Sequence, residues 1–235
     1  MTQIETKLAG KGLGAHIVYF LVRNILWLLL KSWCRLRVEG AEHIPTSGAF
    51  VLAPTHRSII DTPVASAATR RRMRFMGADK WWKNKYFGWL LSALGGFPVT
   101  RGTADREALK RSIALLEGGE PLVLFPEGER KSGPVIHPLF DGAAYVAVKA
   151  GVPIVPVGIG GSERVMPKGA RFIHPRKIVM LIGPPIEVPR DATGKILRAA
   201  ARDVTIALHA ELQRLFDEAE VKAGCGRALL AEELA

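Results

Sequence analysis

The chain has 235 residues, of which 48% are hydrophobic and 23% are charged, and 33 basic against 22 acidic side chains give a net charge of +11. This length suits one domain with a full core, and the balance of apolar and charged residues excludes a disordered or fibrous protein. The basic excess favours partners that carry negative charge, such as nucleic acid, anionic lipid or a phosphorylated substrate.

The first expected element is an apolar helix over Leu13–Leu30. It is about as long as a membrane span, but Arg23 near its middle would cost roughly 2.5 to 3.5 kcal/mol at the bilayer centre, so a single pass is not favoured. Glu5 and Lys7, with no small-residue cleavage site, argue against a signal peptide. We interpret residues 1–35 as a membrane-associating helical segment that lies in one leaflet, with a buried core helix as the alternative.

Short apolar runs alternate with longer helical patterns along the rest of the chain. The expected strands are Leu36–Val38, Phe50–Ala53, Arg74–Met76, Phe97–Thr100, Leu122–Phe125, Ile154–Val157 and Ile178–Ile182. The expected helices are Pro63–Arg71, Trp81–Leu94, Asp105–Glu117, Gly142–Lys149 and Thr193–Ala219. Because parallel pairing needs crossovers of this length, we predict one α/β domain over 36–220 with a mostly parallel central sheet flanked by helices, followed by a tail at 221–235.

A basic and aromatic segment lies within this pattern. Arg70–Lys85 holds seven basic residues and one acid, Asp79, and aromatic residues are interleaved with it or follow it directly: Trp81, Trp82, Tyr86, Phe87 and Trp89. Such a mixture serves base stacking on nucleic acid or the headgroup region of a membrane, and a solvated basic face with core aromatics is the third possibility. Beside the apolar first helix, it favours a membrane surface contacted by that helix and by Trp81–Phe97, with nucleic acid an improbable partner.

The two cysteines, Cys34 and Cys225, carry little functional information. They stand far apart and match neither a zinc spacing nor a disulfide framework. We therefore expect no metal site and a reducing, cytosolic compartment.

The run THRSIID combines a histidine with a carboxylate. His56 is the side chain type best suited to take a proton near neutral pH, and Asp61 can fix its tautomer. Residues five apart on a helix are separated by about 140 degrees, so the motif must span a loop and a helix start. Pro63 fits the first turn of that helix. His56 then emerges at the carboxyl end of a strand, the edge where open α/β sheets bind ligands.

Two further runs place polar residues after strands in the same way. PLVLFPEGER brings Glu127, Gly128, Glu129 and Arg130 to the end of an apolar run, and GFPVTRG does the same for Arg101. Guanidinium groups bind phosphate through paired hydrogen bonds, so Arg101 and Arg130 are candidates for a phosphate pocket beside the base. Taken singly, each arginine would be interpreted as an ordinary surface charge, and it is their shared position after strands that favours the phosphate pocket.

Together these blocks resemble the glycerolipid acyltransferases, most closely the 1-acylglycerol-3-phosphate (lysophosphatidate) acyltransferases. The first block of that family is filled by His56, Ser58 and Asp61, the second by Arg101, the third by Phe125 to Gly128 with Arg130, and the fourth by Pro153 and Pro156. The resemblance covers roughly Val38 to Ile186. This chain departs from the family pattern at two positions, with Thr55 in place of an asparagine and Glu129 in place of a threonine.

The resemblance implies transfer of a fatty acyl group from an acyl-CoA or acyl-carrier-protein thioester to the free hydroxyl of 1-acylglycerol-3-phosphate, which gives phosphatidic acid. His56 would be the general base and Asp61 its orienting partner, with no bound cofactor. No covalent intermediate is required, and the chain has no Gly-x-Ser-x-Gly elbow. The residues that the resemblance assigns to substrate binding are Arg57, Ser58, Lys80, Arg101, Glu127, Gly128, Glu129 and Arg130.

Several points stay open at this stage. Glu129 adds negative charge beside the expected phosphate site unless it points away or pairs with Arg130 or Lys131, so glycerol 3-phosphate or another lysophospholipid is an alternative acceptor. A non-catalytic basic membrane-binding or nucleic-acid-binding protein is the alternative of a different class. The sequence leaves the donor type, the acyl chain length and the oligomeric state undetermined. The expected location is the cytoplasmic face of the cell membrane, as a peripheral or monotopic protein.

Overall fold

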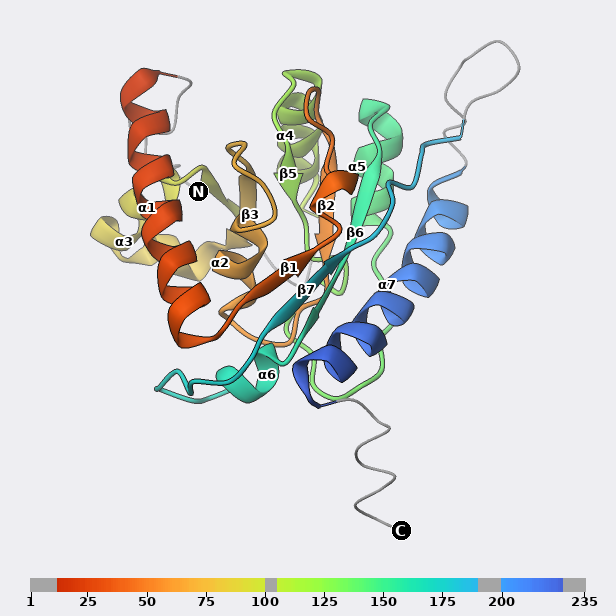
Figure 1. The fold of residues 1–235 in the computed structure, drawn as a ribbon. Helices are drawn as coiled ribbons and strands as arrows, with labels where there is room; N and C mark the ends of the chain where they lie inside the picture. Colours follow the sequence, from red (N-terminus) through yellow and green to blue (C-terminus); the bar gives the residue numbers. More distant parts are fainter. Residues whose placement is uncertain (1–11, 100–104, 190–199, 226–235) are drawn as a thin grey trace.

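The computed structural model describes residues 12–99, 105–189 and 200–225. Within them lies one seven-stranded sheet of order β1-β7-β6-β2-β5-β3-β4 (Figure 1). Neighbouring strands are parallel except β6 and β7, which confirms the predicted α/β class with a mostly parallel sheet. The strands are β1 (Arg37–Glu39), β2 (Val51–Pro54), β3 (Arg74–Ala78), β4 (Gly96–Val99), β5 (Leu122–Val123), β6 (Ile154–Gly160) and β7 (Val179–Ile182).

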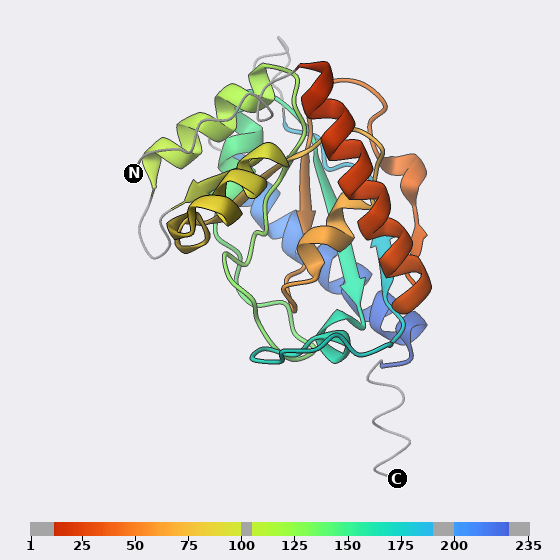
Figure 2. The ribbon, with the colours of Figure 1, turned by 90° about the vertical axis from the view of Figure 1, so that its left-hand side faces the viewer.

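Helices cover both faces of this sheet (Figures 1 and 2). One apolar cluster joins α1 and α2 to one face, and a second joins α4, α5 and α7 to the other. The α-helices are α1 (Leu13–Trp33), α2 (Asp61–Ser66), α3 (Lys85–Ala93), α4 (Arg106–Glu117), α5 (Gly142–Ala150), α6 (Ser162–Val165) and α7 (Ala201–Ala223). Two 3-10 turns, η2 (Ala41–His43) and η3 (Asp79–Lys83), lie in the connections.

The central strand β2 shows why its sequence is apolar without alternation. Leu52 belongs to the cluster on the α1 and α2 side, while Val51 and Ala53 belong to the cluster on the α7 side. Successive side chains of a strand point to opposite faces, and both faces are covered by helices, so every position is buried.

Helix α7 lies close to strand β6 because two glycines leave room for it. A Cβ atom at Gly158 would lie 2.4 Å from the backbone carbonyl carbon of Leu215, and one at Gly160 would lie 2.2 Å from that of Ala219. No side chain fits at this distance, so the two glycines fix the spacing between the sheet and the helix.

Two predicted helices differ from the observed ones. The helix expected over Pro63–Arg71 begins earlier, at Asp61, and ends at Ser66. The helix expected over Trp81–Leu94 is split into η3 and α3. The split occurs because the Asn84 side chain accepts the backbone N–H groups of the first turn of α3 and caps it.

The last predicted helix and the expected domain ends also need comment. Residues 193–199 of that helix lie outside the described residues, and α7 continues to Ala223, past the expected domain boundary at residue 220. Near the start of the chain, helix α1 ends at Trp33, shortly before the boundary of the N-terminal segment expected at residue 35.

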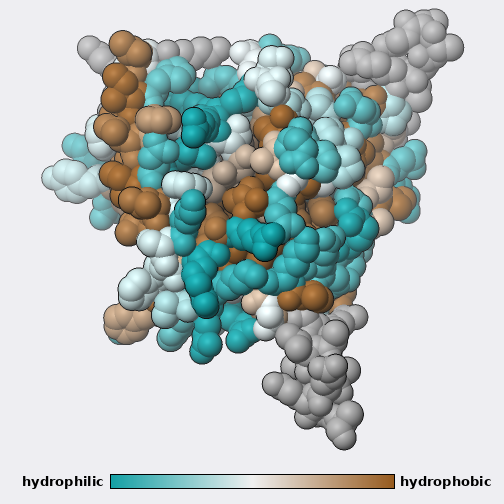
Figure 3. All heavy atoms as spheres, viewed as in Figure 1, coloured by the Kyte–Doolittle hydropathy of each residue, from teal (hydrophilic) through white to brown (hydrophobic). Residues whose placement is uncertain are grey.

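Helix α1 presents two different faces. Ala15, Tyr19, Arg23 and Leu30 are buried on the domain, so the arginine points away from the apolar outer side. The outer side forms a column of hydrophobic residues (Figure 3). Its exposed members are Leu13, Ile17, Phe20, Leu21, Ile25, Leu28, Leu29 and Trp33. By length and composition alone, α1 could cross a membrane, and 22% of its most apolar stretch is buried in the protein.

Candidate active site

His56 and Asp61 form a buried pair at the carboxyl end of β2. Nδ1 of His56 lies 3.1 Å from Oδ2 of Asp61, and the side chains are 7% and 0% exposed. A carboxylate accepts hydrogen bonds, so this contact assigns the ring proton to Nδ1 and leaves the lone pair of Nε2 free. The His56 ring also stacks on Phe125, which follows β5, with centroids 4.0 Å apart. This arrangement suits a general base held in one tautomer.

Asp61 shapes the loop that carries the histidine as well as orienting its ring. Its Oδ2 accepts the backbone N–H groups of Arg57 at 2.7 Å and Ser58 at 2.6 Å. The carboxylate sits in the first turn of α2, where a negative charge is favourable. The five-residue spacing therefore closes a compact turn in which one carboxylate serves both backbone and side chain.

The third block meets the first through a second buried pair. Nη1 of Arg57 donates to both carboxylate oxygens of Glu127, at 2.7 and 2.9 Å, with side chains 1% and 0% exposed. Glu127 also accepts the backbone N–H of His56 at 3.3 Å. In return, the carbonyl of His56 accepts the backbone N–H of Lys131 at 2.9 Å. The loop after β5 thus holds the histidine in place.

His56 opens onto a pocket of about 310 Å³. Two cationic side chains, Lys80 and Arg130, lie on its wall together with the histidine. The rest of the lining is largely apolar and includes Ile59, Pro63, Phe75, Met76, Trp81, Trp82, Phe87, Leu91 and Phe125. The pocket therefore combines a base, positive charge and a hydrophobic wall.

The structure does not bring all the expected substrate-binding residues to this pocket. Arg57, Ser58 and Glu127 are buried and bound to other protein groups: the Ser58 hydroxyl donates to the carbonyl of Met166 at 2.7 Å. These three side chains stabilise the loop that carries His56 and do not line the pocket. Arg101 lies outside the described residues.

Gly128 and Glu129 occupy the turn between β5 and Arg130, and neither lines the pocket. Gly128 has a φ of +72°, and a Cβ there would lie 2.7 Å from the ring of Phe140, which explains the glycine. Glu129 pairs with Lys131 at 2.7 Å. The negative charge of its carboxylate is thus balanced by Lys131, one of the two basic residues expected to pair with it.

Thr55 stands where the resembling family has asparagine, and it has a clear structural role. It is fully buried, and its hydroxyl accepts the backbone N–H of Ile159 at 3.0 Å. The bond ties the end of β2 to β6, so the threonine keeps the strand end in register beside the site.

The hydrophobic wall is the part of the site that sequence reasoning missed. Phe75 and Met76 belong to β3, Leu91 belongs to α3, and Trp82 is held by a hydrogen bond from its Nε1 to the Ser92 hydroxyl at 2.9 Å. The sequence favours a membrane-facing role for the aromatic segment, yet Trp81, Trp82 and Phe87 of this segment line the pocket. No group of three metal-ligating side chains occurs in the described ranges.

The sequence of this chain matches a known protein family. A family model described as "Acyltransferase" matches residues 35–160, which is more than half of the chain. The chain belongs to the acyltransferase family. The matched residues include β2, the His56 loop, β5 and the Glu127 turn.

This acyltransferase has relatives with related names. A protein named 1-acyl-sn-glycerol-3-phosphate acyltransferase from Bacillus subtilis is 28% identical over 170 residues, which cover 72% of this chain and 82% of the relative. One of the same name from Streptococcus pneumoniae is 29% identical over 214 residues, with coverages of 87% and 75%. The crystal structure of a 1-acyl-sn-glycerophosphate acyltransferase, PlsC, from Thermotoga maritima shares the fold, with a TM-score of 0.69, 23% identity, and coverages of 86% and 81%.

Proposed function

We propose that this acyltransferase moves a fatty acyl group from an acyl thioester to the free hydroxyl of 1-acylglycerol-3-phosphate, producing phosphatidic acid. The main support for this proposal is that His56, oriented by Asp61, opens onto a pocket lined by the cations of Lys80 and Arg130 and by an apolar wall. The names of the relatives from Bacillus subtilis and Streptococcus pneumoniae support the same acceptor.

The proposed reaction proceeds by direct attack. Nε2 of His56 takes the proton of the acceptor hydroxyl as its oxygen attacks the thioester carbonyl carbon, and the negatively charged Asp61 stabilises the imidazolium that forms. When the tetrahedral species collapses, the carbon–sulfur bond breaks and the leaving thiolate takes the proton from the imidazolium. The products are the new ester and a free thiol, and His56 returns to its starting form.

The cationic side of the pocket is proposed to bind the acceptor phosphate. Lys80 and Arg130 line the pocket with His56, and the carboxylate of Glu129 is paired with Lys131. Arg101, outside the described residues, is proposed to complete this group because it follows β4 by two residues. A phosphate monoester carries more negative charge than the phosphodiester of other lysophospholipids, so these cations favour lysophosphatidate over them.

Arg130→Gln is expected to raise KM for lysophosphatidate by roughly 10- to 100-fold, because a hydrogen bond to a charged group contributes about 1.5–3 kcal/mol. We expect a much smaller change in kcat. Steady-state thiol release with lysophosphatidate and lysophosphatidylcholine measures both constants. Lys110→Gln on the exposed face of α4 removes the same charge far from the pocket and serves as control. An equal rise in KM for both variants, or none, would remove Arg130 from the phosphate site.

The hydrophobic wall is proposed to hold an acyl chain of a substrate. Leu91→Trp adds volume inside the pocket and should shift donor preference toward chains shorter by about two methylene groups. Each buried methylene contributes about 0.8 kcal/mol, so the ratio of kcat/KM for short over long donors should rise roughly tenfold. Leu91→Met, which conserves volume, should leave the ratio unchanged. A preference that is identical in Leu91→Trp and the parent protein would show that the chain lies elsewhere.

Membrane association forms the last part of the proposal. Helices α1 and α3 lie on the same side of the molecule (Figures 1 and 2). Both carry exposed hydrophobic side chains, which on α3 include Tyr86 and Trp89. A lipid acceptor must reach the pocket from a bilayer, and thioester donors are found in the cytosol. We therefore propose that this side rests on the cytoplasmic face of the membrane, with α1 in the headgroup region.

The double variant Ile25→Asp with Leu28→Asp tests this docking. Both side chains are exposed in the structure, so the variant should still fold. Its partition coefficient onto phosphatidylglycerol vesicles, measured by sedimentation, should fall at least about 100-fold. Ile206→Asp on α7, which is 61% exposed, is the matched control and should sediment normally. Unchanged sedimentation of the double variant would contradict the role of α1.

A further inference from the structure

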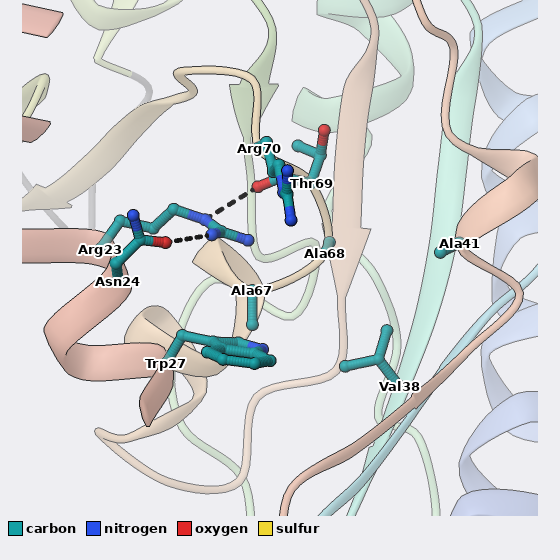
Figure 4. Close-up of a pocket in the computed structure, with 9 residues that line it drawn as sticks. All are labelled: Arg23, Asn24, Trp27, Val38, Ala41, Ala67, Ala68, Thr69 and Arg70. Atoms are coloured by element: carbon teal, nitrogen blue, oxygen red, sulfur yellow. Dashed lines mark hydrogen bonds between the residues drawn. The ribbon is translucent and has the colours of Figure 1, made fainter. Parts of the chain in front are cut away.

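A second cavity lies beside α1, separate from the pocket that contains His56. Its volume is about 310 Å³, and no residue is common to the two linings. Arg23, Asn24 and Trp27 come from α1, and Thr69 and Arg70 come from the loop after α2 (Figure 4). The two cavities adjoin opposite ends of helix α2: Pro63, in its first turn, lines the His56 pocket, and Ala67, just after its last residue, lines the second cavity.

Arg23 is buried in this cavity without a compensating carboxylate. It is 7% exposed, and its Nε donates to the carbonyls of Ser66 at 3.2 Å and Thr69 at 3.1 Å. Its Nη1 donates to the side-chain oxygen of Asn24 at 2.9 Å. All three acceptors are neutral, and Nη2 has no acceptor among the described residues. Burial, with a smaller contribution from Arg70, lowers the pKa of Arg23.

Arg70 stands out in the basic run that the sequence shows. Arg71 and Arg72 donate to backbone carbonyls, and Arg74 forms an ion pair with Glu120. Across the described ranges, Arg70 has neither a hydrogen-bond acceptor nor a carboxylate partner. Three of the four arginines therefore stabilise the fold, and the fourth is directed to the cavity.

The two guanidinium groups face the same space. Figure 4 shows the Arg23 side chain reaching from α1 to the carbonyl of Thr69, beside the Arg70 side chain of the next residue, with the Trp27 ring on the side toward the C-terminal end of α1. Because Arg23 is buried, water only partly screens its repulsion from Arg70, and an anion between the two guanidinium groups would be stabilised by both. A volume of about 310 Å³ admits a phosphate group together with a small substituent. Val38 and Ala41 supply an apolar wall for that substituent.

We propose that this cavity binds a phosphate group, held between Arg23 and Arg70. The phosphate can belong to a lipid headgroup or to a soluble phosphate, and both present the same anionic oxygens. Asn24 and Trp27 belong to the helix whose outer face is exposed and apolar, so the cavity lies beside the proposed membrane surface. The inference does not depend on the chemistry at His56.

Isothermal titration with inorganic phosphate tests the site. The full-length protein carries Arg130→Gln throughout, which weakens phosphate binding in the His56 pocket. In this background, Arg70→Gln should raise the Kd for phosphate at least about tenfold, as expected for loss of a charge-assisted hydrogen bond. Arg202→Gln, on the exposed side of α7, removes the same charge elsewhere and should leave Kd unchanged. Arg70 is exposed, so its replacement should not affect folding.

Vesicles distinguish the two sources of phosphate. The same variants are sedimented with phosphatidylcholine vesicles that contain or lack phosphatidylglycerol. A lipid headgroup is identified if Arg70→Gln binds the anionic vesicles more weakly than Arg202→Gln does, and if inorganic phosphate, added as a competitor, abolishes this difference. A difference in the titration alone identifies a soluble phosphate. If both variants match the background protein in titration and sedimentation, or lose binding equally, the site does not exist as proposed.

Discussion

Replacing His56 with alanine is expected to lower kcat for acyl transfer by about 10³- to 10⁴-fold, near the upper end for loss of a general base. The reason is geometric: Nδ1 is bound to Asp61, so Nε2 is the atom left to accept the hydroxyl proton. Thiol release from an acyl thioester with lysophosphatidate as acceptor measures the loss. KM should change far less, because the imidazole acts mainly in the transition state.

Two companion measurements make the His56 result specific. Asp61→Asn should also lower kcat, by about 10²-fold or more, because an amide can present its N–H to Nδ1 and favour the wrong tautomer. Vesicle sedimentation of His56→Ala should equal that of the parent protein, since His56 is buried and the proposed membrane contacts are exposed side chains of α1. Acyl transfer by His56→Ala within tenfold of the parent rate would exclude it as the base.

Replacing Glu127 with alanine is expected to destabilise the protein by about 3–5 kcal/mol, as for other buried ion pairs that lose one partner. Arg57 would keep its bonds to the carbonyls of Gly133 and Val135 but lose both bonds to the carboxylate. A buried guanidinium would then lack a counter-charge. At about 2–4 °C per kcal/mol for a chain of this size, the melting temperature should fall by roughly 10 °C.

Glu107→Ala is the matched control for the Glu127 result. Its pair with Lys110 is exposed on α4, with side chains 83% and 73% accessible, and such pairs contribute about 0–1 kcal/mol. Thermal unfolding followed by circular dichroism compares the two variants. A melting temperature for Glu127→Ala as high as that for Glu107→Ala would show that the buried pair does not stabilise the loop.

The sheet could be predicted from the sequence because its determinants are local. Each strand is a short apolar run between turns, and polar residues placed directly after β2 and β5 must meet when those strands are parallel neighbours. The bond between His56 and Glu127, 71 residues apart in the chain, is the outcome of that placement.

The roles of individual charges could not be predicted in the same way. Arg57 and Arg130 are both arginines in a motif, yet the first is enclosed by the loop after β5 and the second lines the pocket. Their difference depends on burial, which is set by distant segments: Phe216 of α7 packs on the Arg57 guanidinium at 4.7 Å. Arg23 likewise lines a cavity because its side chain donates to the carbonyls of Ser66, at the end of α2, and of Thr69, in the loop that follows, and no helical pattern in α1 indicates these contacts.

The most direct test of the account is product analysis with the purified protein. Acyl-CoA and acyl-carrier-protein donors are each incubated with lysophosphatidate, and free thiol and phosphatidic acid are quantified together. The account predicts one phosphatidic acid for each thiol released with at least one donor, and no acyl-protein adduct in the mass spectrum of the quenched enzyme. Absence of thiol release with every donor and lysophospholipid acceptor, or an acylated side chain that turns over, would contradict direct transfer by the His56 and Asp61 pair.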